Sequence, residues 1–278
     1  MKRYMKLVNF EFNRFLKFYL VLIGMTFLLQ MIGVIVESRN YMNKANELMT
    51  EELMSKSEFV RIYGTMSFHN ITATEWFLGL IALCGVVLIS FVFIIWYRDW
   101  LGKNTFSYRL LVLPTARFNI YLAKATTILI FLLGLVAFQF LSFSVDSLVL
   151  QWLVPDEFRT DLSVQEITVG YSLAHLPLVL WFPRTFIEFI LYYGGGMIIV
   201  LIGFTAILFE RSFRLKGIFY GLIYSAVSLL ILLTPIYLLQ SNYFYPTELV
   251  FLEIGAGLIV LMGAIWIGNF LLKNKIRV

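Results

Sequence analysis

The sequence predicts an all-α integral membrane protein with six transmembrane helices, and three observations lead to this fold class. Hydrophobic residues make up 60% of the chain and charged residues only 14%, whereas about 25% of the residues in soluble domains are charged. Long apolar runs recur along the whole sequence, and Lys and Arg gather at alternate connections between them. We therefore expect a single transmembrane domain over residues 1–278, with lipid as its main solvent.

Six apolar segments are long enough to span a membrane. A helix needs about 20 mostly apolar residues to cross the hydrocarbon layer, where a helix satisfies its backbone hydrogen bonds internally. The segments are approximately 18–36, 76–97, 120–141, 186–209, 217–239 and 249–272. The first follows a basic N-terminus, as in a signal peptide, but it ends at Glu37 without a small-residue cleavage motif, so we expect it to remain as a span.

The charges predict the orientation of these spans. If the N-terminus is cytoplasmic, sixteen of the 22 Lys and Arg residues lie on the cytoplasmic side, but of the 17 acidic residues only Glu11, Asp99 and Glu210 do. Positively charged connections are retained in the cytoplasm during insertion, so both termini are predicted to be cytoplasmic. The short apolar segment 167–182 would reverse this pattern if it crossed the membrane, and we expect it to lie at the outer interface.

Three regions outside the spans have recognisable patterns. The first 17 residues combine bases with bulky apolar side chains, typical of an amphipathic elbow helix on the inner leaflet, although a solvated basic tail would also fit. Within the outer region 37–75, Met42, Ala45, Met49 and Leu53 recur at helical spacing and predict an amphipathic helix, either a packed connector or a binding cap. The second outer region, 147–185, contains Pro155, Asp156, Glu157 and Asp161, a start signal for a short helix.

The cytoplasmic connection after the second span carries the strongest functional signal. Bulky apolar side chains interleave with bases over residues 97–124, and an amphipathic helix ending before Pro114 would present them to the groove of a partner. The connection resembles that of ABC-2 type transporter permease subunits, which have a Gly-Thr-like turn, a Leu-rich stretch, a Leu-Pro-x-x-Arg element and a later Lys. The matching residues are Gly102, Thr105, Leu110, Leu111, Leu113, Pro114, Arg117 and Lys124.

The resemblance implies a coupling helix that rests on a separate ATPase subunit. The residues expected at this contact are Arg98, Asp99, Trp100, Leu101, Lys103, Phe106, Arg109, Pro114 and Arg117. A possible second contact on the same side is the connection with Arg211, Arg214 and Lys216. In the alternative reading, these bases only maintain the topology and bind anionic lipids.

The chain has no recognisable catalytic, cofactor-binding or metal-binding motif, so we do not expect it to be an enzyme. It has no Gly-x-x-x-x-Gly-Lys-Ser/Thr phosphate loop, so a partner subunit is expected to bind and hydrolyse ATP. His69 and His175 are isolated in outer regions, without a His-Glu-x-x-His zinc motif. No nucleic-acid partner is expected, because the bases lie at membrane edges.

A few polar residues lie within or beside the spans. Ionisable groups are costly in hydrocarbon and are therefore functional candidates, but most of these lie near helix ends, and we expect them to reach the headgroups. They are Lys124, Gln139, Asp146, Glu188 and Glu253. In the alternative reading, Glu188 and Glu253 line the outer part of a path for a cationic or amphipathic substrate.

These features favour the permease subunit of an ATP-binding cassette exporter that moves an amphipathic, peptide or lipid-like substrate. Its expected partners are cytoplasmic ABC ATPase subunits, a second copy or a related permease, and lipids, in the cell membrane of a bacterium. The alternative function is a membrane-embedded binding or immunity protein that sequesters a peptide or lipid without transport. A lipid-modifying enzyme would need a site of unfamiliar design, with the outer carboxylates as its candidates.

Overall fold

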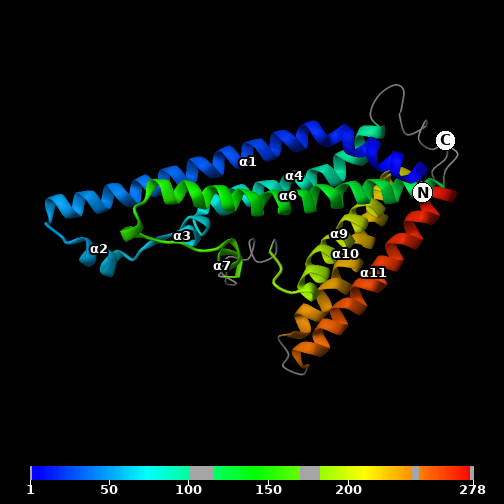
Figure 1. Ribbon diagram of the computed structural model, residues 1–278. Coiled ribbons are helices and arrows are strands. Elements are labelled where there is room, and N and C mark those ends of the chain that lie inside the picture. Colours follow the sequence, from blue (N-terminus) through cyan, green and yellow to red (C-terminus); the bar gives the residue numbers. More distant parts are fainter. Residues whose placement is uncertain (1, 101–115, 170–181, 240–243, 276–278) are drawn as a thin grey trace. The chain divides into compact units, whose positions relative to one another are not determined.

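The computed structural model describes residues 2–100, 116–169, 182–239 and 244–275 (Figure 1). Six helices in these ranges are long and apolar enough to cross a membrane. They are α1 (Lys2–Glu51), α4 (Glu75–Trp100), α6 (Arg117–Leu153), α9 (Phe186–Phe213), α10 (Leu215–Leu239) and α11 (Pro246–Asn274). Each predicted span falls within one of these helices, so the predicted all-α membrane fold with six spans is confirmed.

The residues group into two compact units. The first contains residues 1–15, 88–131 and 185–278, and the second contains residues 16–87 and 132–184. The unit boundaries fall inside α1, α4 and α6. Each of these three helices therefore contributes to both units, whereas α9, α10 and α11 belong to the first unit alone.

Helix α1 begins at Lys2 and continues without a break to Glu51. The N-terminal segment is helical, as predicted for the elbow, but it is the beginning of α1 rather than a separate helix. Its sequence explains the continuity, because no Gly or Pro occurs before Gly24. Leu7 and Val8 pack in a buried cluster with Ile120 and Ala123 of α6, so part of the apolar face of this segment is covered by protein.

Helices α1 and α6 pack along each other within both units. In the first unit, the Tyr4 hydroxyl lies 2.6 Å from the hydroxyl oxygen of Thr126, and the rings of Phe12 and Phe131 stack at 5.2 Å. In the second unit, the rings of Phe27 and Phe138 meet edge to face. Contacts advance in the same direction along both helices, so α1 and α6 are parallel, as expected for helices separated by a single span.

The outer connections form a small layer in the second unit. Its elements are α2 (Lys56–Tyr63), β1 (Met66–Ser67), α3 (Phe68–Thr72), the 3₁₀ helix η1 (Asp156–Phe158), β2 (Arg159–Thr160) and α7 (Val164–Val169). Strand β1 pairs in parallel with β2, and this pairing joins the first outer region to the second.

The amphipathic helix predicted in the first outer region proves to be the end of α1. Ala45 on this part of α1 is buried, whereas Leu53 lies after the end of the helix, has a positive φ of 52° and is exposed. The inclusion of Leu53 in that helix was therefore wrong. Most of the predicted interfacial segment 167–182 lies outside the described residues, but Phe182 at its end is buried against Phe140 and Phe143.

A tight turn joins α9 to α10. The turn is a single residue, Arg214, with a φ of 55°, and the two helices pack side by side (Figure 1). A Cβ atom at Gly217 would lie 2.0 Å from the carbonyl oxygen of Phe209, and one at Gly221 would lie 2.9 Å from that of Ala206. The two glycines therefore allow close approach of the helix backbones, as in other membrane helix pairs.

Replacing Gly217 with Ala should destabilise this helix pair. The added methyl group meets backbone atoms that cannot move aside, and overpacking of this kind costs about 1–3 kcal/mol. Gly194→Ala in α9 is the matched control, because a Cβ atom there meets nothing within 4 Å. Thermal unfolding in detergent should show a loss of stability for Gly217→Ala only, and equal stability of the two variants would contradict the close approach.

Candidate functional site

A buried ammonium group holds together three helices at their predicted cytoplasmic ends. The Lys124 Nζ atom of α6 donates hydrogen bonds to Glu11 Oε1 of α1 at 2.8 Å, to Asp99 Oδ2 of α4 at 2.5 Å and to the Ile95 carbonyl oxygen at 2.7 Å. These bonds use all three donors of a lysine ammonium. Lys124 and Asp99 are each 1% exposed and Glu11 is 2% exposed, so the ion pairs are shielded from water.

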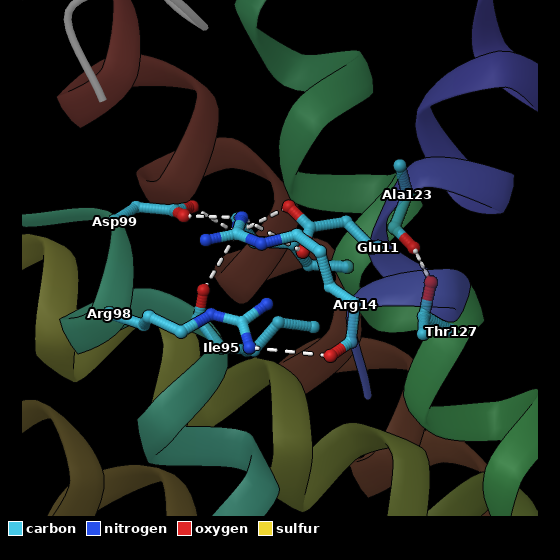
Figure 2. Close-up of polar contacts among 8 residues, drawn as sticks. Glu11, Arg14, Ile95, Arg98, Asp99, Ala123 and Thr127 are labelled. Carbon is cyan, nitrogen blue, oxygen red and sulfur yellow. Dashed lines mark hydrogen bonds and ion pairs between the residues drawn. The ribbon is translucent and has the colours of Figure 1, made fainter. Parts of the chain in front are cut away.

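Arg14 completes this group of charges. Its Nη1 atom donates to Asp99 Oδ1 at 2.6 Å and lies 3.5 Å from Glu11 Oε2. The two carboxylates are therefore balanced by two bases, and each carboxylate contacts both bases (Figure 2). We call Glu11, Arg14, Asp99 and Lys124 the Lys124 cluster. Because buried charges are costly unless they are paired in good geometry, the cluster strongly constrains how α1, α4 and α6 pack.

Arg98 adds a positive charge beside the cluster. Its guanidinium group lies 4.1 Å from the centre of the Phe15 ring, and its Nη1 atom donates to the Arg14 carbonyl oxygen at 3.4 Å. The Nε and Nη2 atoms of Arg98 have no hydrogen-bond acceptor among the described residues. The Glu11 and Asp99 carboxylates still attract the Arg98 guanidinium electrostatically.

The structure brings the two predicted ATPase contacts together. The Arg211 guanidinium group of α9 lies 4.8 Å from the Trp100 ring centre and 5.0 Å from that of Tyr97, both on α4. The Tyr97 hydroxyl donates a hydrogen bond to Glu210, which precedes Arg211. Trp100 from the first contact and Arg211 from the second therefore form one aromatic and basic patch.

The other predicted contact residues have different environments. Asp99 is buried inside the Lys124 cluster, so it has no exposed surface for a direct contact. Arg117 donates from Nη1 to the Leu272 carbonyl oxygen of α11 at 3.0 Å. Arg214 and Lys216 are exposed at the α9–α10 turn. Leu101, Lys103, Phe106, Arg109 and Pro114 lie outside the described residues.

The outer carboxylates are at separate places in the first unit. Glu188 lies in the first turn of α9, where its amide donates to the Thr185 hydroxyl oxygen at 3.2 Å, and Glu253 is half-buried on α11. An apolar hollow of about 650 Å³ lies between α10 and α11, and among the described residues its lining includes the carboxylate of Glu248 but not Glu188 or Glu253.

The Lys124 cluster was not predicted from the sequence. The expectation that Lys124 reaches the headgroups was wrong, because Glu11 and Asp99 hold its ammonium group inside the protein. The sequence does contain a signal for this cluster. Only three acids fall on the strongly basic side that is predicted to be cytoplasmic, and all three pair with neighbouring helices: Glu11 and Asp99 in the cluster, and Glu210 with Tyr97.

Comparison with protein-family models, curated proteins and solved structures finds no match to this chain. In the described ranges, no three or more His, Cys, Asp or Glu side chains come together where they could hold a metal ion. The hydrogen bonds of the Lys124 cluster join its own members and the Ile95 carbonyl oxygen, and Glu11 Oε2 has the ion pair with Arg14 but no hydrogen bond among the described residues. This geometry suits a connection between helices.

Replacing Lys124 with Met should strongly destabilise the protein. The substitution keeps an unbranched side chain but leaves Glu11 and Asp99 buried with one base fewer, and breaking a buried pair in this way costs about 3–5 kcal/mol. The measurement is unfolding by SDS or heat in detergent. Lys273→Met on the exposed end of α11 is the control and should unfold like the wild type.

The double variant Lys124→Met with Asp99→Asn tests whether the lost ion pair, rather than altered side-chain packing, causes the loss of stability in Lys124→Met. Removing one carboxylate together with Lys124 restores the charge balance with Arg14 and Glu11, so it should recover part of the stability lost in Lys124→Met. A double variant less stable than both single variants would contradict the assigned ion pair.

Proposed function

We propose that this chain is the membrane-spanning permease subunit of an ATP-binding cassette exporter, working with a separate ATPase subunit. It moves an amphipathic, peptide or lipid-like substrate across the plasma membrane of a bacterium. The proposal rests on the resemblance of residues 97–124 to ABC-2 permeases and on the six spans. It also rests on the contacts by which the two ends of that connection are joined to each other and to α1.

The ion pair between Asp99 and Lys124 is the observation that carries the proposal. Asp99 lies just before residues 101–115 and Lys124 lies in the third turn of the helix that follows them. Their atoms are 2.5 Å apart, and both side chains contact α1 through Arg14 and Glu11. A partner that displaced this connection would therefore act on α1, α4 and α6 together, because their packing cannot change without disturbing buried charges.

Basic and aromatic groups beside the cluster provide a surface for such a partner. Trp100 and Arg211 pack together at 4.8 Å, and Arg214 and Lys216 are exposed at the neighbouring turn of α9 and α10. Aromatic residues and Arg are enriched where proteins bind one another. An ATPase with an acidic groove lined by apolar residues would complement this surface.

Copurification tests the proposal directly. The tagged chain, purified in mild detergent from its native cells, should carry a protein that hydrolyses ATP. Replacing Trp100, Leu101 and Phe106 together by Glu should abolish this ATPase activity in the purified material, because carboxylates would replace the apolar contacts and reverse the local charge. Trp152→Glu is the matched control, since Trp152 is an exposed tryptophan on the predicted outer side.

The control should retain the copurified ATPase activity. If no ATP-hydrolysing protein accompanies the wild-type chain, or if the triple variant retains it at the wild-type level, the chain is not the permease subunit proposed. Thermal unfolding of the triple variant must match that of the wild type, which separates a lost contact from a lost fold.

Cysteine labelling tests the predicted orientation. In a Cys84→Ser background, which removes the one native cysteine, a Lys216→Cys variant in intact cells should not react with a membrane-impermeant maleimide. It should react after the cells are opened, whereas Glu51→Cys at the end of α1 should react in intact cells. Both positions are exposed to solvent or lipid headgroups, and the reverse labelling pattern would place the basic turns outside.

A further inference from the structure

A second buried polar cluster lies in the other unit, where α1 and α6 pack. Its members are Gln30 of α1 and Ser142 and Asp146 of α6, with exposures of 0%, 1% and 0%. The Ser142 Oγ atom lies 3.0 Å from Gln30 Oε1 and 3.1 Å from Asp146 Oδ2. The proposed transport mechanism uses none of these groups.

The hydrogen atoms available to this cluster determine its protonation. A serine hydroxyl carries one hydrogen and can donate it to one acceptor at a time, but Ser142 Oγ lies between two oxygen atoms. Both contacts are hydrogen bonds only if one of the oxygen atoms also carries a hydrogen. A protonated Asp146 supplies it: Asp146 Oδ2 donates to Ser142 Oγ, which in turn donates to Gln30 Oε1.

The other orientation of the Gln30 amide leads to a less favourable arrangement. With its nitrogen towards Ser142, the amide would donate to Ser142 Oγ, which would donate to an ionised Asp146. In both arrangements Asp146 Oδ1 has no hydrogen-bond partner among the described residues, and neither has Gln30 Nε2 as it is placed, so the two arrangements differ chiefly in the charge on Asp146. A buried carboxylate with one hydrogen bond and no counter-charge is very unfavourable, and such groups normally take up a proton.

The surroundings of Asp146 provide no compensating charge in the described part of the chain. Phe143, one turn before Asp146 on the same helix, packs against Phe68 of α3 and Phe77 of α4. From α1, the neutral Gln30 bonds to Ser142, the hydrogen-bond partner of Asp146. No described Lys, Arg or His forms an ion pair with Asp146, and the influences on its ionisation are burial and the hydrogen bond of Ser142.

We propose that Gln30, Ser142 and Asp146 form a proton-binding site, whose carboxyl group is protonated while α1 and α6 are packed and ionises when they separate. The ligand of this site is a proton, and its binding is linked to the packing of the second unit. The inference depends on the contacts of the second unit alone and holds whether or not the chain works with an ATPase.

Infrared spectroscopy of the purified full-length protein in lipid nanodiscs tests this site. At neutral pH, the wild type should show the carbonyl stretch of a protonated carboxylic acid, and Asp146→Asn should lose that band. Ser142→Ala retains the carboxyl group but removes its acceptor, so the band should remain and shift to higher frequency. Glu47→Gln, a change at an exposed carboxylate of α1, should leave the band unchanged.

The stability that this site contributes to the protein should decrease as the pH rises. An unfolded Asp is ionised above a pH of about 4, whereas the proton bound in the packed site is lost only at a higher pH, so in the pH range between these two ionisations folding takes up a proton. Stability from this site is therefore greatest in acid and falls as the pH rises. Thermal unfolding should show this decline in the wild type and its loss in Asp146→Asn, whose neutral amide is similar in shape.

Three outcomes would overturn the proposal. The first is that Asp146→Asn retains the acid band of the wild type. The second is that its stability declines with pH as in the wild type. The third is that sodium ions stabilise the wild type at alkaline pH but do not stabilise Asp146→Asn, since this would identify the ligand as a metal cation rather than a proton.

Discussion

The three hydrogen bonds of the Lys124 ammonium are the constraint on which the packing of the first unit depends. They join α6 to an acid on α1 and to an acid and a backbone carbonyl on α4. In lipid there is no hydrophobic force that drives apolar helices together, so packing and polar contacts determine how they associate. A fully bonded ammonium fixes the rotation and depth of three helices at once, which apolar contacts alone would leave adjustable.

At the predicted cytoplasmic ends, the acidic residues and the exposed bases have different roles. Glu11, Asp99 and Glu210 pair with groups on neighbouring helices and hold the structure, whereas Arg214 and Lys216 remain exposed. The remaining bases at these ends carry the charge from which the cytoplasmic orientation is predicted. The charged residues at these helix ends can therefore stabilise the interior and keep the predicted cytoplasmic face strongly basic.

The spans could be predicted from the sequence because the thickness of the bilayer sets their length. Their pairing could not, since it depends on the rotation of each helix about its axis, which nearly uniform apolar runs do not reveal. For this reason Lys124 and Asp146 were expected at the headgroups, although both are buried: Lys124 bonds to Glu11 of α1, and Asp146 bonds to Ser142, which contacts Gln30 of α1. The continuation of α1 beyond its span was predicted as helix but placed in a separate segment, because apolar length marks the span and not the end of a helix.

The pairing of β1 with β2 has a consequence for the outer layer. This layer is held by a two-residue ladder, by the Phe59 and Phe158 rings, and by a contact between the hydroxyl groups of Thr65 and Thr160. The one cysteine of the chain, Cys84, is buried on α4, so no covalent bridge within the chain is possible. The assembly of this layer therefore depends on non-covalent contacts within the chain, whatever the redox state of its surroundings.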